Sequence, residues 1–233
     1  MLMLSLETSA KAVSVCLTRD GERLAESFQR TALTHSATLL PMVRDLLRNA
    51  GVDKKELEAV AVAQGPGSFT GIRIGVSTAK GLCWGLDVPA VGVSTLESMA
   101  WLSEGAGEEL LICPAMDARR SQLYNAFFRW ENGALARLTP DRAIAAADAA
   151  EDAAGYSRKV WVLGDGAVLC ASALRERGVD CITAPEHLRW QSAWGVARAA
   201  AGKTPVGAEE LLPVYLRLSQ AERERQEKMR DQK

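Results

Sequence analysis

The feature that most constrains the fold of this 233-residue chain is the glycine-rich run GPGSFTGIRIG at residues 65–75. It follows a short apolar stretch and opens into a helix-like stretch that ends near Trp84. A tight bend between a strand and a helix can point backbone N–H groups at an anion. The glycines permit backbone angles that a side chain forbids, and Thr70 can cap the helix.

The residues of this bend leave two interpretations equally open, a phosphate site and a tight turn without a ligand. The run is not the nucleotide P-loop, because no Lys-Ser/Thr pair closes it, and its glycine spacing differs from the dinucleotide fingerprint. The residues that would contact a phosphate are Gly65, Gly67, Ser68 and Thr70.

Composition narrows the class of protein. Hydrophobic residues make up 48% of the chain, and no apolar run approaches the roughly 20 residues of a membrane span. The net charge of −1 gives no global field that attracts nucleic acid, but it leaves a local basic face open. The five cysteines are scattered without a Cys-x-x-Cys pair, and residues 1–6 lack the features of a signal peptide, so we expect a cytoplasmic protein. The charged tail at 221–233 is expected to be exposed.

The first half of the chain has an order of elements that the second half repeats. Asp20-Gly21 signals a hairpin, and Gly51 ends a long amphipathic helix. The resulting order is βββαβαβα. The predicted strands are 3–7, 12–18, 23–29, 57–63 and 90–93, and the predicted helices are 35–50, 71–84 and 94–102.

The polar segment SEGAGEE at 103–109 is predicted to link the halves, which gives domains at 1–102 and 103–233. Glu131-Asn132-Gly133 signals a hairpin, and a helix is expected to begin near Pro140. The halves share the order of elements but no obvious sequence. The other elements predicted there are strands 110–116, 122–130, 134–138, 160–163 and 180–183, and helices 166–177 and 190–201.

Two halves of this order predict an α/β fold with two mixed-sheet βββαβαβα domains side by side. This is the architecture of the actin, Hsp70 and sugar-kinase (ASKHA) superfamily. In that architecture the first hairpin and the bend after the fourth strand face the same cleft. Here we expect Glu7-Thr8-Ser9 and the bend at 65–71 to do so.

Several segments resemble the TsaB family, also called YeaZ. They are the opening LSLETS, the helix THSATLLPMVRDLLRNAG, the bend GPGSFTGIRIG, MDARRSQLYNAFF at 116–128 and PVYLR at 213–217. The resemblance runs over most of the chain, and the bend motif is highly specific at this length. It implies a bacterial subunit required for N6-threonylcarbamoylation of adenosine 37 in tRNAs that read ANN codons. The implied partners are a TsaD-like catalytic subunit and a TsaE-like ATPase, with tRNA reached only through the complex.

The resemblance also implies that this chain is not the catalyst. The catalytic paralogue holds its metal with two histidines at positions i and i+4 of a helix, where both imidazoles share one face. Thr95 and Met99 stand at the matching positions here, and a hydroxyl and a thioether cannot replace two imidazoles. The two histidines of the chain, His35 and His187, lie outside any ligand cluster. We therefore expect no catalytic residue, no metal and no cofactor of its own.

Helices 35–50 and 71–84 are predicted to form a docking face for the paralogous subunit, or for a second copy of this chain when that partner is absent. Small residues four apart on the second helix would let another helix approach closely. A nucleotide is expected only at this partner interface. Bulky residues in place of Gly75 or Ala79 are expected to leave the fold intact and to abolish association. The predicted interface residues are Leu39, Val43, Ile72, Gly75, Thr78, Ala79 and Leu82.

Two other functions stay open. An ATP-dependent phosphotransferase would hold Mg²⁺ with carboxylates such as Glu7 and Asp165. A module that binds tRNA directly is disfavoured by the near-neutral charge. Asp117, Arg119 and Arg120 could hold a phosphate, but a salt-bridged surface cluster is the favoured interpretation.

Overall fold

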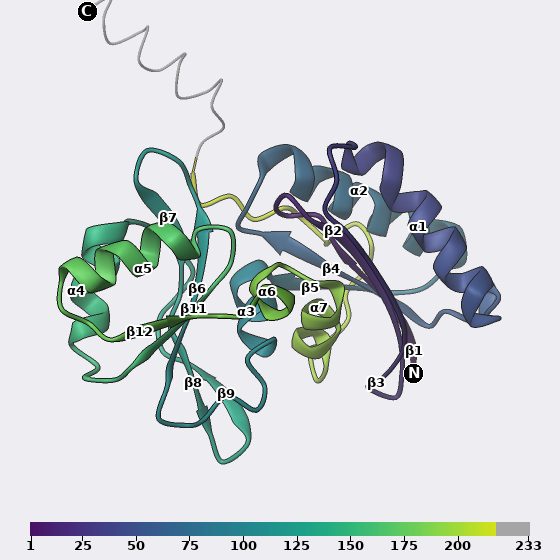
Figure 1. Ribbon diagram of the computed structural model, residues 1–233. Coiled ribbons are helices and arrows are strands. Elements are labelled where there is room, and N and C mark those ends of the chain that lie inside the picture. Colours follow the sequence, from purple (N-terminus) through teal and green to yellow (C-terminus); the bar gives the residue numbers. More distant parts are fainter. Residues whose placement is uncertain (218–233) are drawn as a thin grey trace, which may run out of the picture.

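The computed structural model describes residues 1–217 and contains two β-sheets that lie side by side (Figure 1). The elements of the first half are β1 (Leu2–Glu7), β2 (Val13–Arg19), β3 (Glu22–Gln29), α1 (His35–Ala50), a 3-10 turn (Lys54–Glu56), β4 (Ala59–Gly65), α2 (Phe69–Leu86), β5 (Ala90–Ser94) and α3 (Thr95–Trp101). The predicted βββαβαβα order of this half is confirmed. Its strands pair in the order β3-β2-β1-β4-β5. The predicted exposed tail lies outside the described residues.

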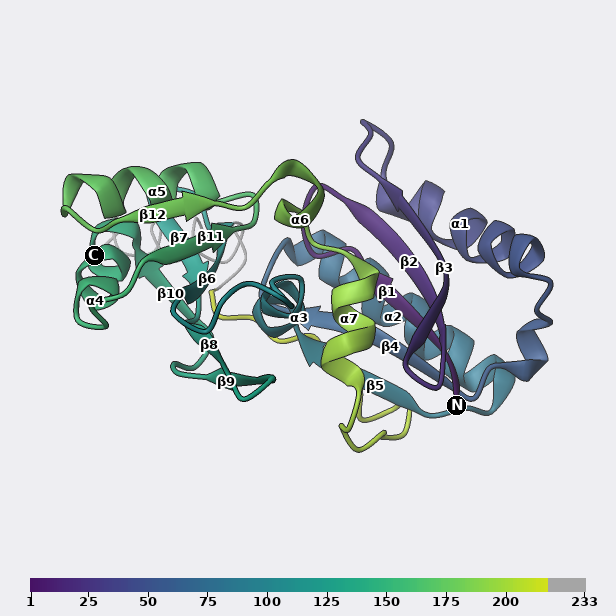
Figure 2. The same cartoon turned by 60° about the horizontal axis from the view of Figure 1, so that its bottom comes forward.

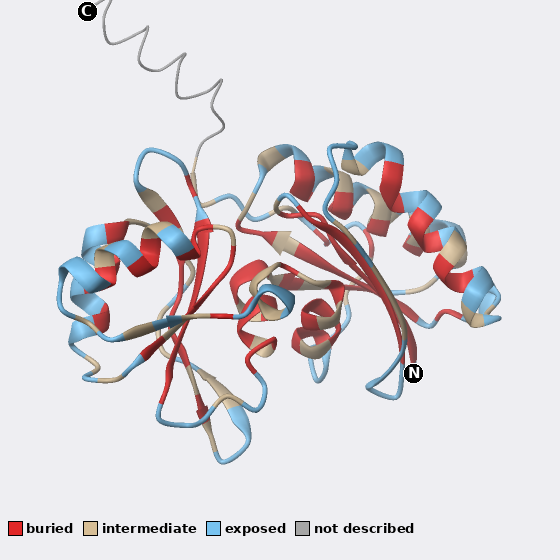
Figure 3. Ribbon diagram, in the orientation of Figure 1, coloured by how far each residue is buried: buried red, intermediate tan, exposed pale blue. Residues whose placement is uncertain are grey.

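The side chains of β1 alternate between two packed layers. Leu4 and Leu6 pack with residues of α1 and α2, such as Leu39 and Ile72. Met3 packs on the opposite face of the sheet with residues of α7 (Ala193–Ala200). Successive side chains of a strand point to opposite faces, so a strand that is covered on both faces reads as a continuous apolar run. Figure 3 shows these strands buried between the two helical layers.

The second sheet has the strand order β10-β7-β6-β11-β12, and β8 pairs with both β6 and β9. Helices α4 and α5 pack on one of its faces (Figure 2). No helix within residues 1–217 is both long and apolar enough to span a membrane. The remaining elements are β6 (Leu111–Asp117), β7 (Gln122–Asn125), β8 (Phe128–Glu131), β9 (Ala134–Arg137), β10 (Arg142–Ala145), α4 (Ala146–Ala154), β11 (Val160–Leu163), α5 (Ala167–Glu176), β12 (Cys181–Thr183) and α6 (Glu186–Arg189).

Two predictions for the second half are wrong. The single strand expected at 122–130 is two strands, because the chain breaks between them at a point where the Phe127 N–H donates to Thr139 Oγ1 at 2.8 Å. The helix expected near Pro140 begins only at Ala146, because residues 142–145 pair with β7 as an extra antiparallel strand. This region is rich in alanine, so its sequence shows no clear hydrophobic periodicity from which a helix or a strand can be predicted.

After the second sheet is complete, the chain returns to the first. Ser192 caps α7, and the Ala193 N–H donates to Ser14 Oγ of β2 at 3.1 Å. Val196 and Ala199 then pack against the first sheet. Residues that the sequence assigned to the second domain therefore complete the first core.

A further apolar cluster joins the two halves. Leu96 and Met99 of α3 pack with Ile112 of β6 and Phe128 of β8. Trp130 Nε1 of β8 donates to Ser103 Oγ at 3.0 Å, just after α3. The sheets are therefore fixed against each other by buried apolar contacts, which are non-directional and scale with the area removed from water.

Helix α2 carries two rows of small residues that face opposite ways. Gly71, Gly75 and Ala79 are buried, and a Cβ on Gly71 or Gly75 would overlap oxygen atoms of Thr8 in the hairpin after β1. Gly81 lies in the other row, where a Cβ would meet nothing within 4 Å. The expectation that a bulky residue at Gly75 or Ala79 leaves the fold intact is therefore wrong, because the first row packs inside the domain.

These two rows predict opposite effects of the same substitution. Gly75→Ala should lower the free energy of unfolding by about 1–3 kcal/mol, because the new methyl overlaps Thr8 Oγ1. Gly81→Ala should raise it by about 0.5–1 kcal/mol, because alanine favours the helix and the site is open. Urea denaturation of both variants measures the difference. Equal stabilities would contradict this account of the two rows.

Candidate functional site

A cleft of about 560 Å³ opens between the two halves. Four segments that are distant in the sequence supply most of its lining: the hairpin after β1, the start of α2, the end of β6 and the closing segment 214–217. The hairpin and the glycine bend meet at one cleft, with Ser9 and Gly67 among its lining residues. Of the predicted Glu7-Thr8-Ser9, however, only Ser9 lines it, because Glu7 and Thr8 are fully buried. The closing segment was not predicted to take part.

The bend is held against the hairpin by backbone contacts. The Ser68 N–H donates to the Ser9 carbonyl oxygen at 2.7 Å. A Cβ on Gly67 would lie 2.5 Å from the same oxygen, so only glycine permits this approach. Ser68 caps α2 by accepting the Gly71 N–H at 3.2 Å. The cap is Ser68 and not Thr70, because the helix begins at Phe69, earlier than predicted.

The closing segment crosses the other side of the bend. The Val214 N–H donates to the Gln64 carbonyl oxygen at 2.7 Å, and a Cβ on Gly65 would overlap the Val214 carbonyl oxygen. Tyr215 stacks on Phe69 with ring centroids 4.8 Å apart. Close packing with two backbone segments therefore accounts for Gly65 and Gly67 without a ligand. Of the four predicted phosphate contacts, Ser68 and Thr70 are exposed, Gly67 is half-buried and Gly65 is buried.

Two carboxyl groups in this region, Glu7 and Asp165, have raised pKa values. Glu7 is fully buried, and its Oε1 accepts the Ser9 N–H at 2.5 Å. Its Oε2 is buried without a hydrogen-bond partner. Burial raises the pKa of Glu7 to about 7. Asp165 lines the cleft and accepts Gln191 Nε2 at 3.1 Å, and burial raises its pKa as well.

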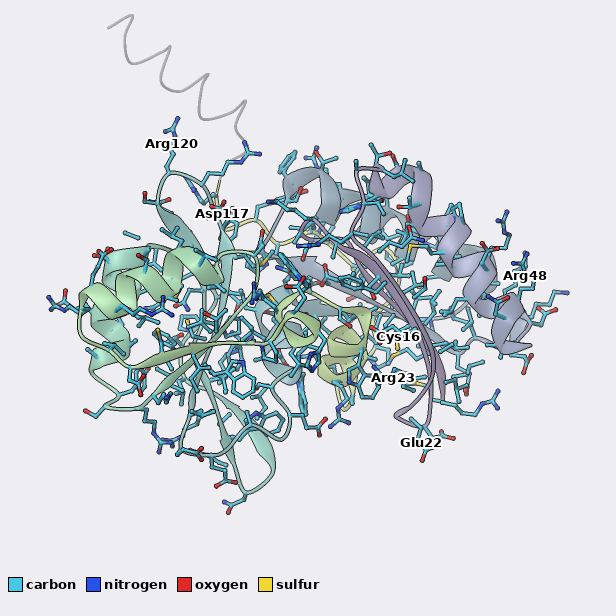
Figure 4. All side chains as sticks on the ribbon, in the orientation of Figure 1. Cys16, Glu22, Arg23, Arg48, Asp117 and Arg120 are labelled. Carbon is cyan, nitrogen blue, oxygen red and sulfur yellow. The ribbon has the colours of Figure 1, made fainter. Side chains whose placement is uncertain are left out.

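The turn between β6 and β7 forms the outer rim of the cleft. Arg119, Arg120 and Ser121 all have positive φ, at 63°, 53° and 56°, which is uncommon for residues with a Cβ. The Arg119 N–H donates to Asp117 Oδ1 at 2.7 Å. Arg120 lies at the tip of this turn and points away from the sheet (Figure 4).

Sequence reasoning missed two cations of the rim, Lys11 and Arg217. Arg217 Nη1 donates to the Ala118 carbonyl oxygen, which ties the closing segment to the second half. The sequence does show a lysine in the first hairpin and an arginine in the PVYLR motif. Because the two residues are far apart in the chain, the sequence does not show that both line one cleft.

The residues at the paralogue's ligand positions are packed in the interior. Thr95 and Met99 have no exposed surface. His35 Nε2 lies 2.7 Å from the Ala10 carbonyl oxygen, and His187 is exposed on α6. Within residues 1–217, no three or more His, Cys, Asp or Glu side chains gather where they could hold a metal ion.

Most of the predicted interface residues are not on the surface. Leu39, Val43, Ile72, Gly75 and Ala79 are buried, so they cannot line an accessible face in this fold. The two that remain partly exposed are Thr78 and Leu82. The accessible residues of the same helices include Leu40, Ser77, Gly81, Trp84 and Gly85.

The buried carboxyl group of Glu7 predicts a pH-dependent stability. Its pKa is about 7 in the folded chain, whereas the ordinary value for a glutamate is 4.5. The contribution of Glu7 to the free energy of unfolding therefore falls as pH rises between these two values. Glu7→Gln keeps an acceptor for the Ser9 N–H and removes the buried charge. The variant should exceed the parent in free energy of unfolding by about 3 kcal/mol at pH 8.5, and the gain should fade toward pH 5. Chemical denaturation across this range tests it, and a gain independent of pH would contradict it.

A family model described as "TsaD: tRNA N6-adenosine threonylcarbamoyltransferase" matches residues 27–160. The tRNA threonylcarbamoyladenosine biosynthesis protein TsaB of Bacillus subtilis (strain 168) is 34% identical over 225 residues, covering 95% of this chain and 96% of its own. The protein of the same name from Escherichia coli (strain K12) is 42% identical over 137 residues, covering 57% of this chain and 58% of its own.

A solved structure described as YeaZ from Pseudomonas aeruginosa has the same architecture. It matches with a TM-score of 0.75 at 29% identity, covering 92% of this chain and 99% of that chain. The predicted α/β fold with two mixed sheets and the family resemblance are both confirmed. The chain belongs to the TsaB (YeaZ) family of tRNA threonylcarbamoyladenosine biosynthesis proteins.

Proposed function

We propose that this chain is a non-catalytic scaffold and activator subunit for N6-threonylcarbamoylation of adenosine 37 in tRNAs that read ANN codons, in the bacterial cytoplasm. The observation that carries the proposal is the burial of Thr95 and Met99 at the positions of the paralogue's metal-binding histidines. Met99 packs in the apolar cluster that joins the two halves. A metal could enter there only if that cluster came apart.

The catalytic partner would dock on the outer surface of α1 and α2, which we call the docking face. It consists of Leu40, Ser77, Gly81, Trp84 and Gly85. Trp84 is 65% exposed and Leu40 is 53% exposed, which is unusual for side chains of this size. Added Cβ atoms at Gly81 and Gly85 would meet nothing within 4 Å, so a helix of the partner can approach the backbone closely.

Family membership supports the other members that we propose for the assembly. A TsaE-like ATPase joins the complex, tRNA reaches this chain only within it, and a nucleotide binds at the partner interface. In the absence of the catalytic subunit, a second copy of this chain covers the docking face. The apolar side chains of the face support this, because surfaces of this kind are usually covered in assemblies.

The position of Glu7 argues against the alternative of an ATP-dependent phosphotransferase. Oε1 of Glu7 is taken up by the Ser9 N–H, and Glu7 is not among the residues that line the cleft. Calorimetry with Mg-ATP would revive this alternative if the purified chain bound the nucleotide at micromolar concentration and turned it over alone.

A charged side chain on the docking face should weaken assembly without unfolding the chain. Gly81→Arg is expected to weaken binding to the TsaD-like subunit by roughly tenfold or more, because the guanidinium blocks close helix packing. Val168→Arg on α5 is the matched control, since Val168 is 74% exposed in the second half. Calorimetric titration measures both. Equal affinities of the two variants would remove the docking face from the proposal.

Omission of single components tests the activity itself. Threonylcarbamoyl transfer to tRNA should require this chain together with the TsaD-like and TsaE-like proteins, and this chain alone should give no modified tRNA. Mass spectrometry of tRNA nucleosides measures the product. Transfer by the isolated chain would refute the non-catalytic assignment, and full transfer without it would refute the activator role.

A further inference from the structure

Two of the five cysteines face each other in the core of the second half. Cys113 lies in β6, the central strand of its sheet, and Cys170 lies in α5, which covers one face of that sheet (Figure 2). Their sulfur atoms are 3.7 Å apart, which is van der Waals contact, although 57 positions separate the two residues in the sequence. Both side chains are almost completely buried. The fold therefore makes a pair of thiols that the sequence does not reveal.

The surroundings of Cys113 are more polar than simple packing requires. A buried thiol is often only a small apolar group that fills a core. Here the fully buried Asn125 of β7 donates from Nδ2 to Cys113 Sγ at 3.2 Å, and the same Nδ2 lies within hydrogen-bond distance of two backbone carbonyl oxygens. Arg142 in turn donates from Nη2 to Asn125 Oδ1 at 3.1 Å. The amide N–H favours negative charge on this sulfur, which is the charge that a thiol carries when it attacks another sulfur atom.

At rest the pair is two thiols. The hydrogen bond with Cys170, together with burial, raises the pKa of Cys113 well above its ordinary value, so this sulfur keeps its proton at neutral pH. A disulfide needs sulfur atoms about 2.0 Å apart, so closure requires a relative shift of about 1.7 Å. The buried neighbours Ala167 and Ala171 are small, which lets α5 lie close to the sheet.

We propose that Cys113 and Cys170 form an intramolecular disulfide when the chain meets a peroxide. Peroxide is small enough to reach Cys170 when α5 opens locally. The Cys170 thiolate attacks one peroxide oxygen, the O–O bond breaks, and the hydroxide that leaves takes up the thiol proton to become water. Cys113 Sγ then attacks the sulfenic sulfur of Cys170. The S–S bond forms, the S–O bond breaks, and a second water leaves with the Cys113 proton, so that two thiols lose the two electrons that peroxide gains.

The disulfide connects two elements that both reach the floor of the cleft. Strand β6 continues to Asp117, and α5 follows the turn that carries Asp165, and both of these residues line the cleft. The Gly166 N–H donates to the Ala115 carbonyl oxygen at 3.0 Å, so this turn already lies on β6. Closure of the bond therefore tightens this end of the second half. The inference is independent of the proposed function, because the docking face lies on α1 and α2 of the first half.

Peroxide treatment of the full chain tests the proposal, with the remaining thiols alkylated in denaturant before proteolysis and mass spectrometry. The parent should lose two hydrogens and give a cross-link between Cys113 and Cys170, and dithiothreitol should restore both thiols. Cys113→Ser should abolish the cross-link. Cys181→Ser is the matched control and should keep it, because Cys181 Sγ contacts the Ala171 carbonyl oxygen in the same half.

The cross-link map of the parent decides the question even if a serine variant fails to fold. Sulfinic acid at Cys113 or Cys170 without a cross-link would overturn the proposal, and so would a cross-link to Cys181 in its place. Equal yield of the cross-link from the urea-unfolded chain would also overturn it, because the fold would then play no part in the pairing.

Amide exchange measures the effect of the bond on the cleft. Peptides from α5 and from residues 164–166 should exchange about threefold more slowly, or slower still, after oxidation and should recover after reduction. Peptides from α1 and α2 should not change. Unaltered exchange in α5 of the fully cross-linked chain would contradict the tightening of the second half.

Discussion

The rest of the structure depends on the close backbone packing around the bend at residues 65–71. The hairpin passes Gly67 and Gly71, and the closing segment passes Gly65, at distances that exclude a Cβ. Backbone atoms of three distant segments are thereby held in one place. The bend is a junction as well as a turn, and the cleft has its shape because this junction fixes the hairpin and the closing segment beside the start of α2.

Helix α2 extends from this junction and serves two surfaces. Its buried row lets it lie directly on the hairpin, so the helix is anchored over much of its length. Its exposed row then stays available to a partner, because the helix needs only one apolar stripe to bind its own sheet. In our account this exposed row faces the catalytic subunit.

Sequence reasoning works best where local patterns decide the structure. The bounds of α1 are predicted correctly, because leucines at helical spacing and Gly51 at the end leave little choice. It is weaker in the alanine-rich region around β10, where pairing with β7 overrides local preference. The small residues of α2 show two rows by spacing alone, but which row is buried depends on Thr8, far away in the chain. The closing segment could not be foreseen either, since Tyr215 contacts Arg73 across 142 positions of sequence.

Hydrogen–deuterium exchange of this chain, alone and with the TsaD-like subunit, shows whether α1 and α2 are covered by the partner. If the chain acts by presenting a docking face, the partner should slow amide exchange in peptides from α1 and α2. Peptides from the second sheet, including β11 and α5, should exchange as they do in the chain alone. Protection confined to the second half, or no protection at all in the presence of excess partner, would contradict the account.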